Sequence, residues 1–116
     1  MYRPFGASVL EEYANEYFKM EWKDPYMLYA SDVRVSNLPA ITHVDNTCRA
    51  QTVGDDNPVF KKLLVEYHRL TGSAVLLNTS LNLAGKPIAG SPESALELFY
   101  DSKLDCLIIG NTILSK

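Results

Sequence analysis

Apolar residues recur every three or four positions in three segments of the chain, which is the spacing of a helix with one buried face. These segments are residues 9–19, 58–71 and 91–99. Ser8, Asn57 and Ser91 stand where an N-cap belongs. Gly72 follows the second segment and is a natural helix stop. The pattern therefore predicts three amphipathic helices.

Runs of β-branched, aromatic and aliphatic residues lie between and after these segments and favour strands. The expected strands are residues 26–35, 41–44, 48–53, 74–77, 104–109 and 112–114. Ala30-Ser31-Asp32 is expected to interrupt the first strand as a bulge. The 74–77 run does not alternate, which predicts burial on both faces and a central place in the sheet. Gly110-Asn111 is expected to form the two-residue turn of a hairpin.

Helices interleaved with strands predict an α/β fold, a mixed twisted open sheet covered by about three helices. The chain has 116 residues, which is enough for one hydrophobic core, so residues 1–116 are expected to form a single domain. Its residues are 47% apolar and 22% charged, as in ordinary globular proteins. This composition argues against a disordered chain.

The charge balance narrows the classes of partner. Eleven basic and 14 acidic residues give a net charge of -3, so no global field attracts nucleic acid or an anionic membrane, and neither is expected as a partner. Binding of an anionic ligand would therefore need a local cluster of basic residues. The two cysteines lack metal-ligand spacing, so no metal site is expected, and no signal peptide is evident. A cytoplasmic location follows as the expectation, and homo-oligomers stay open.

The hairpin-like segment 42–53 is the first candidate for chemistry. If the chain reverses at Asn46, His43 and Arg49 lie across from each other on one face, where a guanidinium and an imidazole can hold a phosphate. A shift of one residue places His43 opposite Cys48 and removes this convergence. The alternative is that both residues lie on a solvated hairpin face.

A polar loop directly after the 74–77 strand is the second candidate. Its residues are Asn78, Thr79, Ser80, Leu81 and Asn82. Loops at the carboxyl ends of strands often bind phosphate or ribose oxygens. The alternative is a loop whose short polar side chains bond to each other and to the local backbone. Arg3, just before the first expected helix, could reach an anion near that helix start or could be a solvated residue near the terminus.

Four strings together resemble one family. They are residues 3–10 (RPFGASVL), 42–53 (THVDNTCRAQTV), 76–88 (LLNTSLNLAGKPI) and 91–96 (SPESAL). In order and spacing they resemble the C-terminal domain of the NodU/CmcH O-carbamoyltransferases. The resemblance extends over essentially the whole chain.

This resemblance implies a YrdC-like fold and a carbamoyltransferase that makes carbamoyl-adenylate from carbamoyl phosphate and ATP, for transfer to an acceptor hydroxyl. ATP, with or without Mg²⁺, would be a substrate, and no tightly bound cofactor is implied. His43 and Arg49 would be the catalytic residues. The residues binding substrate or nucleotide would be Arg3, Asn78, Thr79, Ser80, Asn82 and Lys86.

The chain also departs from the family pattern. Family members usually carry a Lys-x-Arg element before the Arg-Pro-Phe block, and that block begins here at Arg3. The chain is therefore expected to be N-terminally truncated and to act with a partner chain that supplies those cations and a sugar-kinase-like acceptor domain. Leu81 replaces a family Phe, and Lys86, in place of a family Glu, could compensate in part for the missing cations. Alternatives are a catalytically inactive nucleotide-binding or protein-interaction module and, more weakly, a tRNA-modifying YrdC enzyme.

Overall fold

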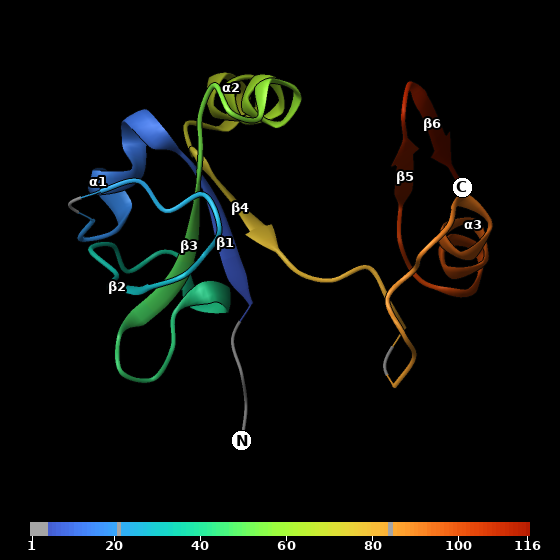
Figure 1. The fold of residues 1–116 in the computed structure, drawn as a ribbon, viewed down its shortest axis with the longest axis horizontal. Helices are drawn as coiled ribbons and strands as arrows, with labels where there is room; N and C mark the ends of the chain where they lie inside the picture. Colours follow the sequence, from blue (N-terminus) through green and yellow to red (C-terminus); the bar gives the residue numbers. More distant parts are fainter. Residues whose placement is uncertain (1–4, 21, 84) are drawn as a thin grey trace. The chain divides into compact units, whose positions relative to one another are not determined.

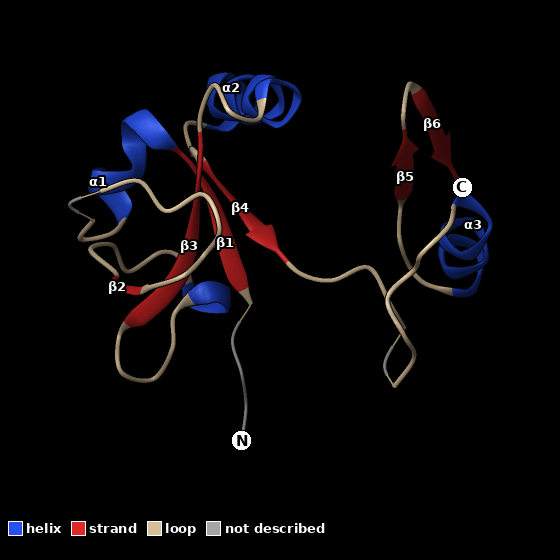
Figure 2. Ribbon diagram, in the orientation of Figure 1, coloured by secondary structure: helices blue, strands red, loops and turns tan. Residues whose placement is uncertain are grey.

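The computed structural model describes residues 5–20, 22–83 and 85–116 (Figure 1). The chain divides into two compact units, Met1–Thr79 and Ser80–Lys116. Figure 2 shows strands and helices in both units. The single domain expected from the chain length stays a prediction.

A four-stranded sheet in the order β2-β3-β1-β4 forms the centre of the first unit. Its strands are β1 (Gly6–Leu10), β2 (Ala30–Asp32), β3 (Thr47–Val53) and β4 (Val75–Asn78). β1 is parallel to β3 and antiparallel to β4, while β2 is antiparallel to β3. The expected α/β class and mixed sheet are thus confirmed. The central place expected for residues 74–77 is wrong, because among the described residues β4 pairs with β1 alone and lies at an edge.

The helix expected over residues 9–19 is also wrong in its first half. Val9 and Leu10 belong to β1, and only η1 (Glu11–Tyr13) and α1 (Ala14–Tyr17) are helical. β1 forms ladders with strands on both sides, and this pairing buries both Val9 and Leu10. Sheet pairing of this kind overrides a local helical pattern.

The strand expected over residues 26–35 is reduced to β2. The Asp24 carbonyl accepts a hydrogen bond from Thr52 N at 3.0 Å, and Ala30 then pairs with Arg49. Residues 25–29 therefore bulge out of the edge of the sheet. Ala30, Ser31 and Asp32, which were expected to form the bulge, instead pair with β3.

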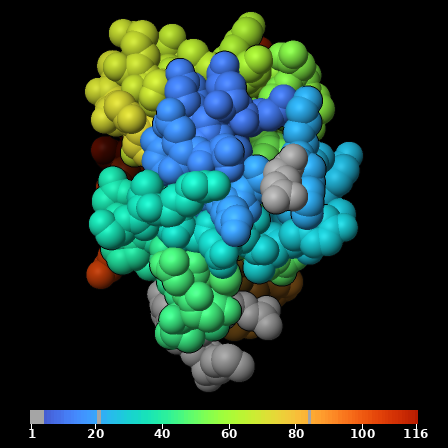
Figure 3. Space-filling view, turned by 90° about the vertical axis from the view of Figure 1, so that its left-hand side faces the viewer, coloured from blue at the N-terminus to red at the C-terminus, as the bar shows by residue number. Residues whose placement is uncertain are grey.

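The strand expected over residues 41–44 is absent, since η2 (Pro39–Ile41) and a tight turn occupy this part. Arg34 N donates to Tyr17 O at 2.7 Å and Lys19 N to Asp32 O at 2.8 Å, which joins the segment after α1 to that after β2. In the space-filling view these segments, blue and cyan, lie side by side on one face (Figure 3). They form a layer outside the sheet.

The second expected helix is confirmed as α2 (Pro58–Thr71). It ends at Gly72, whose φ of 78° is left-handed. Leu64 is fully buried and packs in a cluster with Leu10, Val53 and Ala74. α2 thus covers one end of the sheet. None of the helices in the described ranges is both long and apolar enough to cross a membrane.

The second unit follows the sequence expectation closely. α3 (Pro92–Asp101) begins at Ser91, whose Oγ accepts a hydrogen bond from Ser94 N at 3.1 Å. β5 (Cys106–Ile109) and β6 (Thr112–Ser115) form the expected hairpin. A small core joins this hairpin to α3 through Ala95, Phe99 and Leu107.

Candidate functional site

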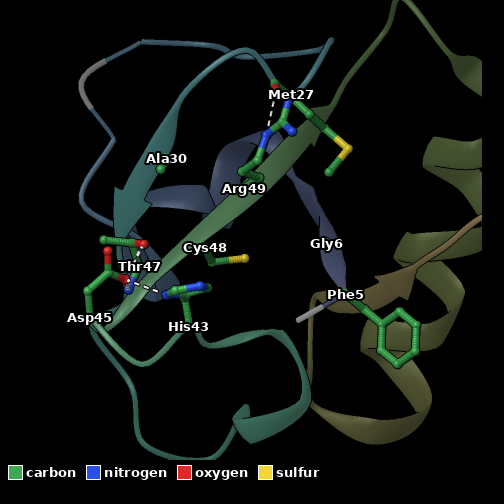
Figure 4. Close-up of a pocket in the computed structure, with 9 residues that line it drawn as sticks. All are labelled: Phe5, Gly6, Met27, Ala30, His43, Asp45, Thr47, Cys48 and Arg49. Atoms are coloured by element: carbon green, nitrogen blue, oxygen red, sulfur yellow. Dashed lines mark hydrogen bonds and ion pairs between the residues drawn. The ribbon is translucent and has the colours of Figure 1, made fainter. Parts of the chain in front are cut away.

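A cavity of about 430 Å³ opens in the first unit beside the start of β3 (Figure 4). Its volume is within the usual range for small-ligand sites. Its walls come from β1 and the residue before it, the segment 27–30, the turn before β3, and β3 itself. The lining residues are Phe5, Gly6, Met27, Ala30, His43, Asp45, Thr47, Cys48 and Arg49. The structure therefore brings His43 and Arg49 to one cavity.

The turn before β3 carries His43, but its register differs from the prediction. His43 N donates to Thr47 O at 2.8 Å, and Asn46 N donates to His43 O at 2.8 Å. The reversal is thus centred on Asp45, and His43 faces Thr47 rather than Arg49. The reason is local, since Asn46 adopts a left-handed φ of 66°, which closes a three-residue turn over residues 44–46, one residue earlier than the predicted turn over residues 45–47. Both side chains nevertheless line the cavity.

Asp45 gives the histidine a negatively charged neighbour. His43 Nδ1 lies 3.3 Å from Asp45 Oδ1, but the two atoms are not aligned for a hydrogen bond. This buried nitrogen therefore has no hydrogen-bond partner among the described residues. Asp45 Oδ1 accepts hydrogen bonds from Thr47 Oγ1 at 2.6 Å and Thr47 N at 3.1 Å. The Thr47 hydroxyl, and to a lesser degree the Thr47 N–H and His43, lower the pKa of Asp45. The carboxylate therefore stays ionised beside the imidazole at neutral pH.

Arg49 is anchored rather than free. Its guanidinium donates to the Met27 carbonyl through Nε at 3.2 Å and Nη2 at 2.7 Å, as the dashed line in Figure 4 marks. These bonds fix one edge of the planar group and leave its remaining N–H groups for other partners. A positively charged fork held in place beside a cavity is suited to bind an anion.

Asn78 belongs to a polar network on the sheet. Its Nδ2 donates to Ser8 Oγ and to Gln51 Oε1, both at 3.2 Å. Ser8 Oγ also donates to Gln51 Oε1 at 3.1 Å, and Gln51 Nε2 donates to Pro25 O at 3.2 Å. This network joins three strands and the bulge, so the Asn78 amide nitrogen already has protein partners.

The other predicted residues lie elsewhere. Thr79 is exposed at the end of the first unit. In the second unit Ser80 Oγ donates to Asn82 Oδ1 at 2.6 Å, and Asn82 Nδ2 donates to Lys86 O at 3.1 Å. Their polar groups thus bond within the loop, as in the alternative stated from sequence. Arg3 lies outside the described residues.

Sequence reasoning missed several residues of the site. Asp45 was not among the predicted site residues, although an Asp two residues before a Thr is a known local hydrogen-bonding pattern. Gln51 had a signal, since it lies two residues after Arg49 and so on the same face of β3. Met27 had no signal of its own. Cys48 also lines the cavity, but burial raises the pKa of its thiol to about 11, so it is not an ionised nucleophile at neutral pH.

Fold and site together define an α/β protein with a cavity suited to an anionic ligand. The family model described as carbamoyltransferase C-terminus matches residues 1–116. The chain therefore belongs to this family, the C-terminal domain of the NodU/CmcH carbamoyltransferases.

Characterised relatives agree with this assignment. The chain is 39% identical over 114 residues to the 3'-hydroxymethylcephem-O-carbamoyltransferase of Amycolatopsis lactamdurans, a match that covers 96% of the chain and 22% of that protein. It is 39% identical over 122 residues to the nodulation protein NolNO of Sinorhizobium fredii, covering 99% of the chain and 18% of that protein. The chain thus spans about a fifth of the length of these relatives.

Proposed function

We propose that the chain binds carbamoyl phosphate in the cavity lined by His43 and Arg49, as the part of a carbamoyltransferase that forms carbamoyl-adenylate with ATP. One observation carries the proposal: in a chain of this family, these two residues meet at one cavity of suitable volume. Water would release phosphate from carbamoyl phosphate, the resulting carbamate would displace pyrophosphate from ATP to give carbamoyl-adenylate, and the carbamoyl group would then pass to an acceptor hydroxyl with release of AMP.

The ligand chemistry matches these residues. Carbamoyl phosphate carries a phosphate group whose oxygens a guanidinium can grip in pairs. Arg49 offers a guanidinium whose position the Met27 carbonyl already fixes. His43, whose Nδ1 lies 3.3 Å from Asp45 Oδ1, can donate a hydrogen bond to the ligand from Nε2–H. Fixed positive charge of this kind offsets the negative charge that develops on phosphate during group transfer.

The remaining parts of the reaction are assigned by resemblance. Ser80, Asn82 and Lys86, and likewise Asn78, Thr79 and Arg3, would be residues that bind substrate or nucleotide, the nucleotide being ATP with or without Mg²⁺, and the fold would be YrdC-like. The hydrogen bond between Ser80 and Asn82 would exchange for bonds to the nucleotide. By the same resemblance, a partner chain with a sugar-kinase-like domain would supply the acceptor site. The use of ATP suggests the cytoplasm as the compartment.

Isothermal titration with carbamoyl phosphate, and with its stable analogue phosphonoacetamide, tests the proposal. Arg49→Ala should weaken binding about 10- to 100-fold, the value of a hydrogen bond to a charged group. Arg69→Ala is the matched control, since it removes the same charge from an exposed pair with Glu66 on α2. Absence of binding by the unmodified chain, or equal binding by the two variants, would contradict the proposal.

A further inference from the structure

Residues 25–29 bulge out of the edge of the sheet and contact the side chains of β3. Two of these side chains hold the bulge by its carbonyl groups. Gln51 Nε2 donates to Pro25 O at 3.2 Å, and Arg49 donates to Met27 O through both Nε and Nη2. The bulge is therefore attached to the arginine of the candidate site.

Met27 adopts an unusual backbone conformation at the point of contact. Its φ of 56° is left-handed, which is unfavourable for a residue other than glycine or asparagine. Gly6 makes room for it, because a Cβ there would collide with the Met27 methyl group. Strained residues persist only where their surroundings hold them in place. Neighbouring groups must therefore fix the bulge.

Asp24 is the residue that fixes it. It is only 2% exposed and makes no ion pair among the described residues, so its carboxylate depends on hydrogen bonds. Oδ1 accepts from Leu28 N at 2.9 Å, and Oδ2 accepts from Tyr29 N at 3.0 Å. At its own backbone, Asp24 N donates to Thr52 Oγ1 at 2.9 Å. Both carboxylate oxygens thus hold the chain directly after Met27.

We propose that Asp24 is a positioning residue for the Arg49 guanidinium. It holds the bulge in the shape that aims the Met27 carbonyl at Arg49, and the carbonyl in turn fixes which N–H groups face the cavity. The effect on ligand affinity rests on the proposed function, because the held guanidinium is the group that meets the phosphate. The effect of Asp24 on the position of the Arg49 guanidinium does not depend on the proposed function.

Hydrogen exchange of the Arg49 Nε–H tests the first step without ligand. In ¹⁵N-labelled protein this signal is assigned by its loss in Arg49→Lys. Asp24→Ala should speed its exchange about tenfold, since a hydrogen bond worth roughly 1.4 kcal/mol is lost. The Arg69 Nε–H, bound to Glu66 on α2, is an internal reference that should not change. Unchanged exchange at Arg49 would overturn the proposal.

Titration with phosphonoacetamide tests the second step. Asp24→Ala should weaken binding about tenfold in the unmodified chain and have no further effect in an Arg49→Ala background. Additive losses would show that Asp24 acts elsewhere and would overturn the positioning role. Asp55→Ala removes an exposed aspartate paired with Lys61 and should bind normally. If the unmodified chain binds nothing, the proposed function fails, while the exchange experiment still decides the role of Asp24.

Asp24→Asn keeps the test decisive if Asp24→Ala does not fold. The amide retains one acceptor oxygen for Leu28 N or Tyr29 N and loses the other. Exchange of the Arg49 Nε–H should then lie between the unmodified chain and complete loss of protection. Exchange equal to that of the unmodified chain would contradict the role.

Discussion

Replacing Asn46 tests the turn that presents His43 to the cavity. Asn46 has a left-handed φ of 66°, and its Nδ2 donates to Val33 O at 3.1 Å. Alanine at this position loses the side-chain hydrogen bond and tolerates the left-handed conformation less well. Glycine loses the same bond but adopts the conformation without strain.

The expected magnitudes follow from these two differences. The lost hydrogen bond is worth about 1 kcal/mol, and the carbonyl it leaves belongs to the buried Val33. The left-handed conformation adds roughly 1 kcal/mol for alanine. Asn46→Ala should therefore lower the free energy of unfolding by about 2 kcal/mol, and Asn46→Gly by about 1 kcal/mol.

Urea denaturation followed by tryptophan fluorescence measures the free energy of unfolding of the first compact unit. Trp22 is the only tryptophan of the chain and lies in that unit, Met1–Thr79. Asn57→Ala is the control, since Asn57 has a φ of -137° and makes no side-chain cap bond. It should change stability by less than about 0.5 kcal/mol. Equal losses for the alanine and glycine variants of Asn46 would refute the contribution of backbone strain.

Three further predictions concern the two cores and the cavity wall. Leu64→Ala should destabilise the first unit by about 3 kcal/mol in urea denaturation, and Leu70→Ala, at an exposed site on the same helix, by under about 0.5 kcal/mol; similar losses would contradict the packing of α2. Burial raises the pKa of Cys48 from 9.0 to about 11, so its contribution to stability is complete below about pH 9 and is lost as the pH rises towards 11. Urea midpoints of Cys48→Ala should fall less over this range than those of the unmodified chain, and parallel curves would contradict the shift. Ser91→Ala should destabilise α3 by about 1 kcal/mol, seen as faster amide exchange in α3, and unchanged exchange would contradict the cap.

Elements set by local signals could be predicted from the sequence. α2 and α3 have an apolar stripe and clear start signals, and the β5–β6 hairpin has its turn residues. β1 could not be predicted, because its spacing of apolar residues fits a helix as well. Only its pairing with β3 and β4, distant in sequence, decides for a strand. The edge position of β4 depends on the same long-range pairing.

The convergence of His43 and Arg49 was predicted from the sequence, but its geometry was not. His43 and Arg49 do line one cavity, yet the register that suggested this was wrong. This difference in register follows from the left-handed φ of Asn46, which closes the turn over residues 44–46. The sequence pattern did not specify this turn. The hydrogen bonds that anchor Arg49 could not be predicted from the sequence either, because the acceptor is a backbone carbonyl and every residue has one. Asp24 gave no indication in the sequence that its side chain holds the segment that carries this carbonyl.

Left-handed backbone conformations of residues other than glycine occur at the candidate site in the first unit. Among the residues described, the two with positive φ that are not glycine are Met27 and Asn46. Met27 lines the cavity, and Asn46 stands between Asp45 and Thr47, which line it too. Each holds a different side chain, Met27 through its carbonyl at Arg49 and Asn46 through the turn at His43. The left-handed conformation is unfavourable for Met27, and its position at the cavity supports the proposal that the cavity holds a ligand.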